Sequence, residues 1–381
     1  MPPTHAPAVR VLLGRSLAGA LLLFLSAGSS AATAAAPRDQ TTAAAIAGVE
    51  AVMQAAASNG FAGALIIQRG DTTLLSRGYG FANREHRVPF TPDTIAQIGS
   101  ITKSQTAAAI ATLIAEGKVA LSDPVARFAP EAPEPGRSRT IGQLIAHRSG
   151  FADSCAEDFD HVSEKEFISR CLAIPLAHTP GENSYSNMGY SALALVVQRA
   201  TGKSWEDAIR VRVWKPLHME KIGFSFTGTD DRLFAHGYMK DVEQPVISRS
   251  IAALKGDDWA LRGNGGVQAS AVEMIRFLDG LLDLPGALPP EARTLLATAA
   301  PGESGEVREG FGLVFRYDSA GNLLRMAHAG SDGVFYAYLG WVPANDVRIY
   351  FVGNNGETEI KPVLRDALRA AIALPPGGPV S

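Results

Sequence analysis

The feature that most constrains this chain is the stretch of residues 99–117, which has the pattern of a single helix with reactive groups in its first turn. It begins at Gly99, continues through alanines, isoleucines and a leucine at helical spacing, and ends at Gly117. Glycine suits the left-handed position that follows a helix. Ser100 falls in the first turn and Lys103 comes three residues later, so both lie on one helix face. The stretch therefore predicts a serine hydroxyl with an amine beside it in one rigid element.

That pairing has the parts of a nucleophile and its base. A serine alcohol becomes reactive when an adjacent base takes its proton and when fixed dipoles await the oxyanion. A helix N-terminus supplies such dipoles, and burial lowers the pKa of a lysine toward its neutral form. A single Ser-x-x-Lys is weak on its own, because most such pairs lie on solvated helix faces. The interpretation of Ser-x-x-Lys as a catalytic pair is strengthened by two further motifs that follow it in the right order, Tyr185-Ser186-Asn187 and then His328-Ala329-Gly330.

Composition narrows the class of protein. A chain of 381 residues that is 46% hydrophobic and has 38 glycines can bury a large core, in two closely packed lobes. The formal net charge of -3 leaves no basic surface of the kind that nucleic acid requires. We therefore expect a small-molecule or peptide substrate and no nucleic-acid partner.

The N-terminus has the pattern of a signal peptide. Arg10 and Arg15 precede an apolar run at residues 17–27, and small residues at 31–36 offer cleavage sites. The run is short for a membrane span, which needs about 20 residues. We expect residues 1–36 to be removed, with no stable membrane span afterwards, and the mature protein to be periplasmic or secreted.

The two cysteines, Cys155 and Cys171, fit such a compartment. A disulfide that closes a loop of this size stabilises by roughly 3 kcal/mol on the chain-entropy model. The alternative is two unrelated buried thiols, since the sequence alone does not place their Cα atoms within bonding range. We favour the disulfide.

The order of helix and strand patterns predicts an α/β fold of the α+β type. A helix at residues 41–57 precedes a hairpin of strands at 61–68 and 72–79, and strands return at 310–317, 323–327, 333–341 and 347–353 before a helix at 361–374. Between them, residues 121–284 carry helical signals with capping boxes. We expect an antiparallel sheet built from both chain ends and flanked by helices, with a mostly helical lobe inserted.

One domain is thus predicted over residues 37–374. Its sheet lobe takes about 37–98 and 300–374, its helical lobe about 99–299, and residues 375–381 form a tail. Tyr336, Tyr338 and Trp341 alternate as strand residues do, and we expect them on one packed face.

The three motifs together resemble the serine β-lactamase and penicillin-binding protein superfamily, in which Ser-x-x-Lys is a signature. The branch that the chain is most similar to contains class C β-lactamases, DD-peptidases of the Tyr-x-Asn type and β-lactamase-like esterases. Residues 144–150, 180–182 and 263–267 add to the resemblance, which covers essentially the whole mature chain. It implies a β-lactamase/transpeptidase-like fold.

The resemblance also implies a role for each site residue. Ser100 would be acylated by the substrate carbonyl, Lys103 and Tyr185 would share its proton, and Asn187 would hold Lys103 and a substrate amide or ester group. Whether the lysine or the tyrosine is the base stays open. The backbone N–H groups of Ser100 and Ser331 would bind the oxyanion.

Each residue also has a plain structural interpretation. Tyr185 alone could be a loop tyrosine, Asn187 an N-cap and His328 a structural histidine. His147 belongs to a stretch that ends in a turn, and we assign it a structural role.

The third motif departs from the pattern of many β-lactamases. They have lysine, then threonine or serine, then glycine, where this chain has His328, Ala329 and Gly330. An imidazole is only partly charged near neutral pH, and Ala329 lacks the hydroxyl that would bind a substrate carboxylate. We therefore expect an esterase or DD-peptidase-like serine hydrolase, with a class C-like β-lactamase or a non-catalytic β-lactam or peptidoglycan sensor as alternatives.

Competing types of enzyme lack their motifs here. The sequence contains no Gly-x-Ser-x-Gly, no His-Glu-x-x-His and no phosphate-binding glycine loop before a lysine. We expect no cofactor and no metal.

Overall fold

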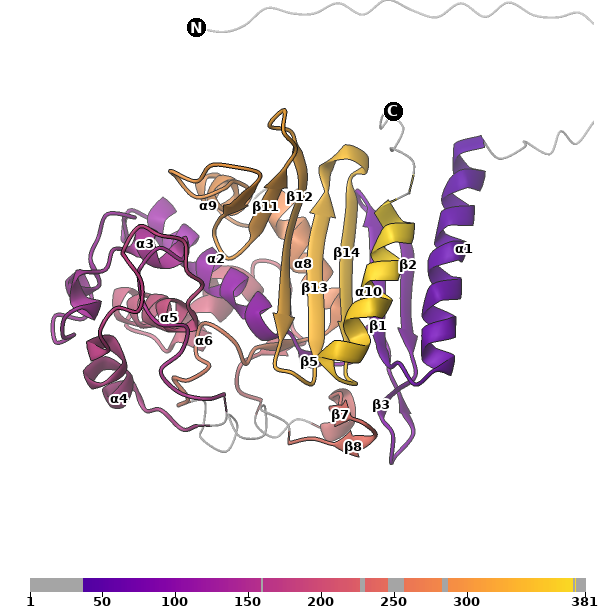
Figure 1. The fold of residues 1–381 in the computed structure, drawn as a ribbon, viewed down its shortest axis with the longest axis horizontal. Helices are drawn as coiled ribbons and strands as arrows, with labels where there is room; N and C mark the ends of the chain where they lie inside the picture. The colour runs from indigo at the N-terminus through magenta and orange to yellow at the C-terminus, as the bar shows by residue number, and fades with distance from the viewer. Residues whose placement is uncertain are drawn as a thin grey trace, which may run out of the picture.

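A computed structural model describes residues 37–158, 160–226, 230–245, 257–282, 287–372 and residue 374. The predicted signal peptide at 1–36 and the predicted tail at 375–381 lie outside these residues. Figure 1 shows a sheet lobe beside a mostly helical lobe.

The sheet lobe is built around seven antiparallel strands in the order β10-β11-β12-β13-β14-β1-β2. Their bounds are β1 Gly63–Arg69, β2 Thr72–Tyr79, β10 Val307–Glu309, β11 Val314–Tyr317, β12 Leu323–Ser331, β13 Tyr336–Val342 and β14 Val347–Gly353. β1 pairs with β14 over seven residue pairs, from Gly63 with Gly353 to Arg69 with Val347. The sheet is therefore assembled from both ends of the chain, as the sequence predicts, and β1 and β14 are its hydrogen-bonded junction.

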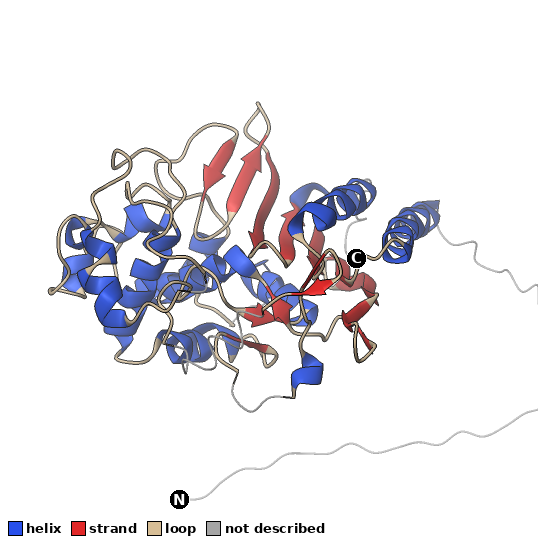
Figure 2. Cartoon of the chain, turned by 60° about the horizontal axis from the view of Figure 1, so that its bottom comes forward, coloured by secondary structure: helices blue, strands red, loops and turns tan. Residues whose placement is uncertain are grey.

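Helices cover both faces of this sheet. α1 (Pro37–Ser58) and α10 (Glu357–Ile372) pack together on one face, and α8 (Ala271–Leu282) lies against β13, β14 and β1 on the other (Figures 1 and 2). Because side chains alternate between the two faces of each strand, the sheet contributes to a hydrophobic core on either face. Leu65 and Phe351 face α1 and α10, whereas Ala64 and Val352 face α8 and the helical lobe.

The helical lobe is organised around α2 (Thr102–Ala115), which is buried from its first residue to Leu113. The other helices are α3 Ile141–Ile145, α4 Glu164–Ser169, α5 Asn187–Thr201, α6 Trp205–Ile209 and α9 Pro290–Leu296. The capping boxes predicted at Thr140 and Ser163 are both formed. Gly202, in the left-handed conformation, ends α5.

Short strands form three small additional sheets. They are β3 Phe81–Asn83, β4 Val88–Pro89, β5 Ala96–Gln97, β6 Ile222–Gly223, β7 Tyr238–Met239, β8 Val242–Glu243 and β9 Gln268–Ala269. β9 lies between β5 and β6 in a three-stranded sheet, and β5 ends just before the turn that carries Ser100. The antiparallel sheet, its flanking helices and the inserted helical lobe confirm the predicted fold class.

Three local predictions were wrong. Trp341 does not share a face with Tyr336 and Tyr338, because residues five and three apart on a strand point to opposite faces, and Trp341 packs toward the helical lobe. The strand predicted at 323–327 continues to Ser331, so the whole third motif lies inside β12. The predicted helix at 99–117 begins with a separate 3-10 turn, described below.

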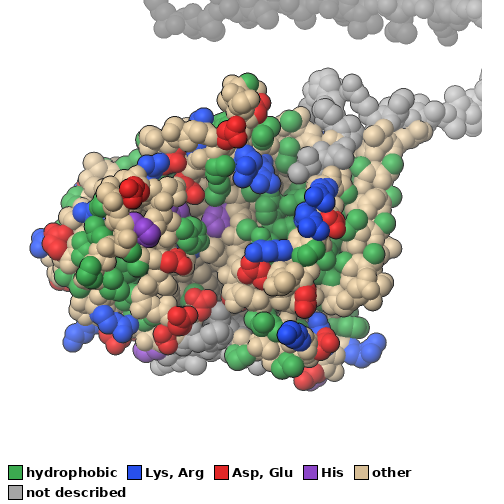
Figure 3. Space-filling view, in the orientation of Figure 1, with side chains coloured by type: hydrophobic (Ala, Val, Ile, Leu, Met, Phe, Trp, Pro, Cys, Tyr) green, Lys and Arg blue, Asp and Glu red, His purple; other side chains and the backbone are tan. Residues whose placement is uncertain are grey.

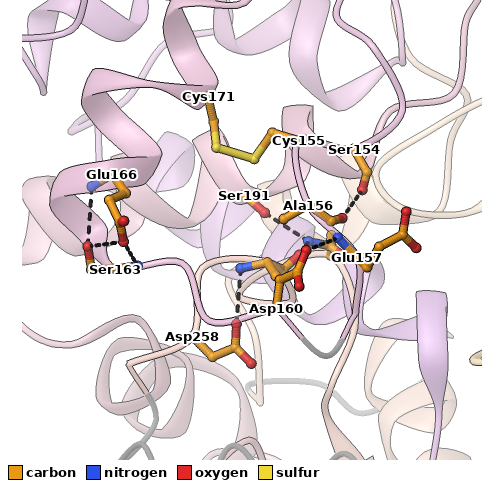
Figure 4. Close-up of a disulfide and its surroundings, with 12 residues drawn as sticks. Ser154, Cys155, Ala156, Glu157, Asp160, Ser163, Glu166, Cys171, Ser191 and Asp258 are labelled. Carbon is orange, nitrogen blue, oxygen red and sulfur yellow. Dashed lines mark hydrogen bonds between the residues drawn. A yellow bond between two sulfur atoms is a disulfide. The ribbon is translucent and has the colours of Figure 1, made fainter.

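Cys155 and Cys171 are joined by a disulfide in the helical lobe (Figure 4), with a Cα–Cα distance of 5.5 Å. Cys171 starts a short 3-10 helix directly after α4, and Cys155 lies in the loop that precedes α4. The bridge therefore closes this loop against the helix, between the two cysteines for which the sequence favoured a disulfide.

Of the helices among the described residues, none combines the length and the apolar composition that a membrane crossing needs.

Candidate functional site

Ser100 lies in the turn that joins the sheet lobe to α2. It is the middle residue of the 3-10 helix η1 (Gly99–Ile101), which runs directly into α2. Lys103 follows in the first turn of α2, and its Nζ lies 3.1 Å from Ser100 Oγ. The spacing of three residues brings the amine to the alcohol as predicted, although the alcohol comes from the tighter 3-10 turn.

Lys103 is completely buried, and this burial sets its protonation. Its Nζ donates to Asn187 Oδ1 at 2.6 Å and to the backbone carbonyl of Asn264 at 2.9 Å. Burial lowers the pKa of Lys103 to about 7. A neutral amine has two N–H groups and one lone pair, so these two oxygens leave the lone pair for the proton of Ser100.

Tyr185 contacts the same two groups. Its hydroxyl is hydrogen-bonded to Ser100, and Lys103 Nζ lies 4.7 Å from the centre of its ring. The residue as a whole is 41% exposed, but burial of the hydroxyl end raises the pKa of Tyr185 above its usual value. The phenol therefore keeps its proton at neutral pH, where Lys103 is half titrated. The environments of the two groups favour the lysine as the base in the free protein.

His147 holds Tyr185 in place. The two rings are stacked with their centroids 4.4 Å apart, and His147 Nδ1 accepts the backbone N–H of Ser186 at 3.0 Å. Burial lowers the pKa of His147 well below its usual value, so the imidazole is neutral and its Nδ1 is free to accept. The sequence assigned His147 a structural role, and in the structure its ring packs against the ring of Tyr185.

Asn187 is the first residue of α5, and the helix cap is its neighbour Ser186. Asn187 Nδ2 donates to Asp153 Oδ1 at 3.0 Å, which turns the amide oxygen toward Lys103. The N-cap interpretation of Asn187 is therefore wrong, because Ser186 accepts the N–H of Gly189 at 3.0 Å instead.

Two glycines bring the backbones of Ser100 and Ser331 together. A Cβ on Gly99 would lie 2.5 Å from the backbone nitrogen of Ser331, and Gly99 has a φ of 51°. A Cβ on Gly330 would lie 2.0 Å from the carbonyl oxygen of Ile98 and 2.8 Å from the nitrogen of Ser100. Only glycine at both positions lets β12 lie this close to η1. The backbones of Ser100 and Ser331 thus meet at one place, the arrangement that an oxyanion hole needs.

His328 lies in the cavity beside Ser100 but carries no charge. Its Nδ1–H donates to the carbonyl of Ala329 at 2.6 Å. Burial, with Lys103 nearby, lowers the pKa of His328 to about 4, so the ring is neutral near pH 7. Ser331 uses its hydroxyl to donate to Glu357 Oε2, so its backbone and not its side chain faces the reaction.

Sequence reasoning missed two supporting groups. Asp153 orients Asn187, and the carbonyl of Asn264 is the second acceptor for Lys103. Asn264 is itself fixed by hydrogen bonds from its Nδ2 to Ser191 Oγ and to the carbonyl of Ala260, each 2.8 Å long. Asn264 lay in a stretch that carried the family resemblance, but only the tertiary contact shows what its carbonyl does.

Of the predicted residues, five line one cavity: Ser100, Tyr185, His328, Gly330 and Ser331. Lys103 contacts Ser100, and Asn187 contacts Lys103 and lines a smaller cavity that also reaches Ser100. Cys155 and Cys171 are separate from it and belong to the disulfide. Among the described residues, no group of three His, Cys, Asp or Glu side chains is placed to hold a metal ion.

Comparison with known proteins identifies the class. The family model described as Beta-lactamase matches residues 48–374, and this chain belongs to that family. The family contains esterases, β-lactamases and DD-peptidases that act as serine hydrolases.

Individual relatives come from several of these groups. The chain is 29% identical over 224 residues to PbpX of Bacillus subtilis (strain 168), named as a penicillin-binding protein, covering 59% of this chain and 56% of PbpX. It is also 29% identical over 294 residues to esterase EstB of Burkholderia gladioli, covering 67% of this chain and 74% of EstB. The chain thus spans little more than half of PbpX.

A solved class C β-lactamase from Rhodobacter sphaeroides is similar in fold. It superposes with a TM-score of 0.70 and 21% identity, covering 87% of this chain and 99% of the β-lactamase. This likeness confirms the β-lactamase/transpeptidase-like fold that the motifs implied.

Proposed function

We propose that this protein is an exported serine hydrolase that works through a Ser100 acyl-enzyme on a small ester, amide or D-amino-acid peptide. One observation carries the proposal: a fully buried lysine with a pKa lowered to about 7 lies 3.1 Å from the Ser100 hydroxyl. An amine that is neutral at physiological pH can take the proton of the alcohol it touches.

Acylation follows from these contacts. Ser100 Oγ bonds to the substrate carbonyl carbon while its proton passes to Lys103 Nζ. The carbonyl oxygen becomes negative and is bound by the backbone N–H groups of Ser100 and Ser331. The bond to the leaving group then breaks, and the leaving group takes a proton from Lys103 by way of the Tyr185 hydroxyl, which stays protonated at neutral pH.

Deacylation repeats the sequence with water. The water oxygen bonds to the acyl carbon, and its proton passes to the neutral amine of Lys103. The ester bond to Ser100 breaks, the acid leaves, and Ser100 regains its proton. Asn187 and the Asn264 carbonyl hold the amine in place throughout.

The third motif favours an esterase or DD-peptidase-like activity over an efficient β-lactamase. His328 is neutral, and Ala329 offers no hydroxyl, so the strand has no charged or hydroxyl donor for a carboxylate beside the scissile bond. The similarity to an esterase and to a penicillin-binding protein supports the same choice. Class C-like β-lactamase activity is the alternative within the same chemistry.

Export is part of the proposal. It is supported by the signal-like sequence of residues 1–36 and by the Cys155–Cys171 disulfide, which persists in oxidising compartments. The periplasm or the exterior would be the place of action.

The test combines a variant with a label. We expect Ser100→Ala to lower kcat/KM by about 10⁴-fold or more on the best of nitrocefin, p-nitrophenyl esters and D-Ala-D-Ala peptides. A fluorophosphonate probe should add its mass to the peptide that contains Ser100 in the native protein and not in the variant. A label on a different serine, or full activity in Ser100→Ala, would reject the proposal, and acylation without turnover would indicate a sensor instead.

A further inference from the structure

The cavity that holds Ser100 does not end at the reacting groups. It has a volume of about 800 Å³ and continues along the outer face of β11, β12 and β13, beside α10. We propose that this extension binds a substrate arm that is apolar along its length and negatively charged at its far end, as in an ester or amide carrying a distal carboxylate, phosphate or sulfate. The inference rests on the proposed function, because it concerns the substrate of the same serine.

The floor of the extension is apolar. Val314 of β11, Ala327 of β12 and Tyr338 of β13 lie on the same face of the sheet, and Leu364 and Leu368 reach it from α10. Strand residues two apart and helix residues four apart each line one side, so the surface is continuous. An arm with carbon atoms along its length would remove this surface from water.

The walls of the extension are basic. Lys361, Arg365 and Arg369 recur at every fourth residue of α10, and Arg316 and Arg325 stand on the opposite side. We call these five residues and the floor between them the basic groove. No aspartate or glutamate is among the described residues that line the cavity, although Glu357 and Asp366 of α10 pair with the three helix cations from outside the lining. Figure 3 shows basic side chains on both sides of a hydrophobic stretch of this face.

The two strand arginines are placed against each other. Arg316 and Arg325 are directly opposite in the register of β11 and β12, an arrangement that is unfavourable for like charges. Among the described residues, neither arginine has a carboxylate within ion-pair distance. Arg325 interacts with the hydroxyl of Tyr338, a residue of the floor. A bound anion would relieve the repulsion and accept hydrogen bonds from both guanidinium groups.

The distance explains why the charge must sit at the end of an arm. Arg325 precedes Gly330 by five residues on β12, so it lies on the order of 15 Å along the strand from the oxyanion donors. Next to Ser100 the same strand offers a neutral imidazole and a methyl group. The groups that can bind a negative charge therefore lie at the far end of β12 and not beside the scissile bond.

The other side of Ser100 disfavours the same arm. A cavity of about 40 Å³ lies there, and Asp158 and Asp332 are among its lining residues. Its size and its carboxylates exclude a long anionic group. The basic groove is thus the direction in which an acidic arm can lie.

The test uses two series of esters of increasing arm length, one with the arm on the acyl side and one with the arm on the alcohol side. Each length is prepared with a terminal carboxylate and with a terminal methyl ester. At low salt we expect the longer carboxylates to show a kcat/KM about tenfold above their neutral partners in one series, an effect of the size of two exposed ion pairs. Added salt should reduce the difference.

A charge-reversed variant connects the preference to the groove. Arg316→Glu/Arg325→Glu should lower kcat/KM for the long carboxylates about tenfold or more and leave the neutral esters within twofold. Lys203→Glu/Lys215→Glu, which makes the same change of net charge at exposed lysines of the helical lobe, should leave the preference intact.

The outcomes separate the two proposals. Equal use of charged and neutral arms at every length and in both series, or an equal effect of the arginine variant on both, would overturn the inference while hydrolysis at Ser100 stands. Absence of turnover and of Ser100 acylation with every ester would reject the proposed function and the inference with it.

Discussion

The reaction centre and the basic groove share one cavity but are built in opposite ways. In the reaction centre, Lys103, His147 and His328 are buried, and each has hydrogen-bond partners supplied by the protein. In the basic groove, Lys361, Arg365 and Arg369 are exposed on one side of a helix, with side chains that are 53%, 58% and 74% accessible.

The difference is also one of charge. Burial holds the pKa of His328 at about 4 and that of Lys103 at about 7, and it raises the pKa of Tyr185, so the reaction centre is close to neutral at physiological pH. The groove gathers five cations near the surface, three of which pair with carboxylates of α10: Lys361 with Glu357, and Arg365 and Arg369 with Asp366. Burial thus sets the protonation of the reacting groups, whereas selectivity for a charged substrate depends on exposed side chains some distance away.

The largest effect should come from separating the backbones that meet in the reaction centre. Gly330→Ala places a Cβ against the Ile98 carbonyl and the Ser100 nitrogen, and it must push β12 away from η1. Removal of one oxyanion donor costs about 10²–10³ in kcat, and we expect a loss of that size.

Steady-state kinetics on the best ester, with thermal unfolding to verify the fold, would measure the effect of Gly330→Ala. Gly48→Ala in α1 is the matched control, because nothing lies within 4 Å of the added methyl group. If Gly330→Ala folded and kept half of its activity, the assignment of the oxyanion hole would be wrong.

The pH profile should reveal the neutral amine. The pKa of Lys103 is lowered to about 7, and only the deprotonated form accepts the proton of Ser100. Activity is therefore present above pH 7 and lost as pH falls through it, about tenfold per pH unit at lower pH. A kcat/KM profile of a neutral ester from pH 5 to 9 measures this.

A second group could imitate that profile. Burial also raises the pKa of Glu309 to about 7, so Glu309→Gln is the required control. The loss of activity below pH 7 should persist in Glu309→Gln. If it disappeared, the titrating group would be Glu309 and not Lys103.

The smallest expected change restores a hydroxyl to the reaction centre. Ala329→Thr adds a donor on the cavity side of β12, and one new hydrogen bond to a substrate carboxylate contributes about 1 kcal/mol. We expect kcat/KM for nitrocefin to rise by up to about tenfold while neutral esters stay within twofold.

Ala327→Thr provides the control for Ala329→Thr. It places the same hydroxyl two residues farther along the same face, on the floor of the basic groove. An equal gain from both variants would mean that the effect does not depend on the position beside the scissile bond.

Much of the site could be predicted from the sequence because its residues lie in short motifs. A spacing of three residues places Lys103 beside Ser100, and Tyr185 and Asn187, two residues apart along the chain, both contact Lys103. The order of helix and strand patterns gave the sheet built from both chain ends, since alternation and helical period are local properties.

Groups that act through the backbone have no side-chain signature. The N–H of Ser331 was named only through the family resemblance, and the carbonyl of Asn264 was missed, because its role depends on where two distant segments meet. The prediction for Trp341 failed for a different reason. Side chains alternate between the two faces of a strand, and Trp341, three residues after Tyr338, points to the opposite face.

By itself, the sequence determined which functional groups are present and which of them are neighbours along the chain. Only the tertiary structure decided their charge and their surroundings, because the pKa of Lys103 depends on complete burial among residues from three segments. It also decided that Arg316, Arg325 and the basic face of α10 would meet over one apolar floor, since strand register and helix packing are properties of the folded chain.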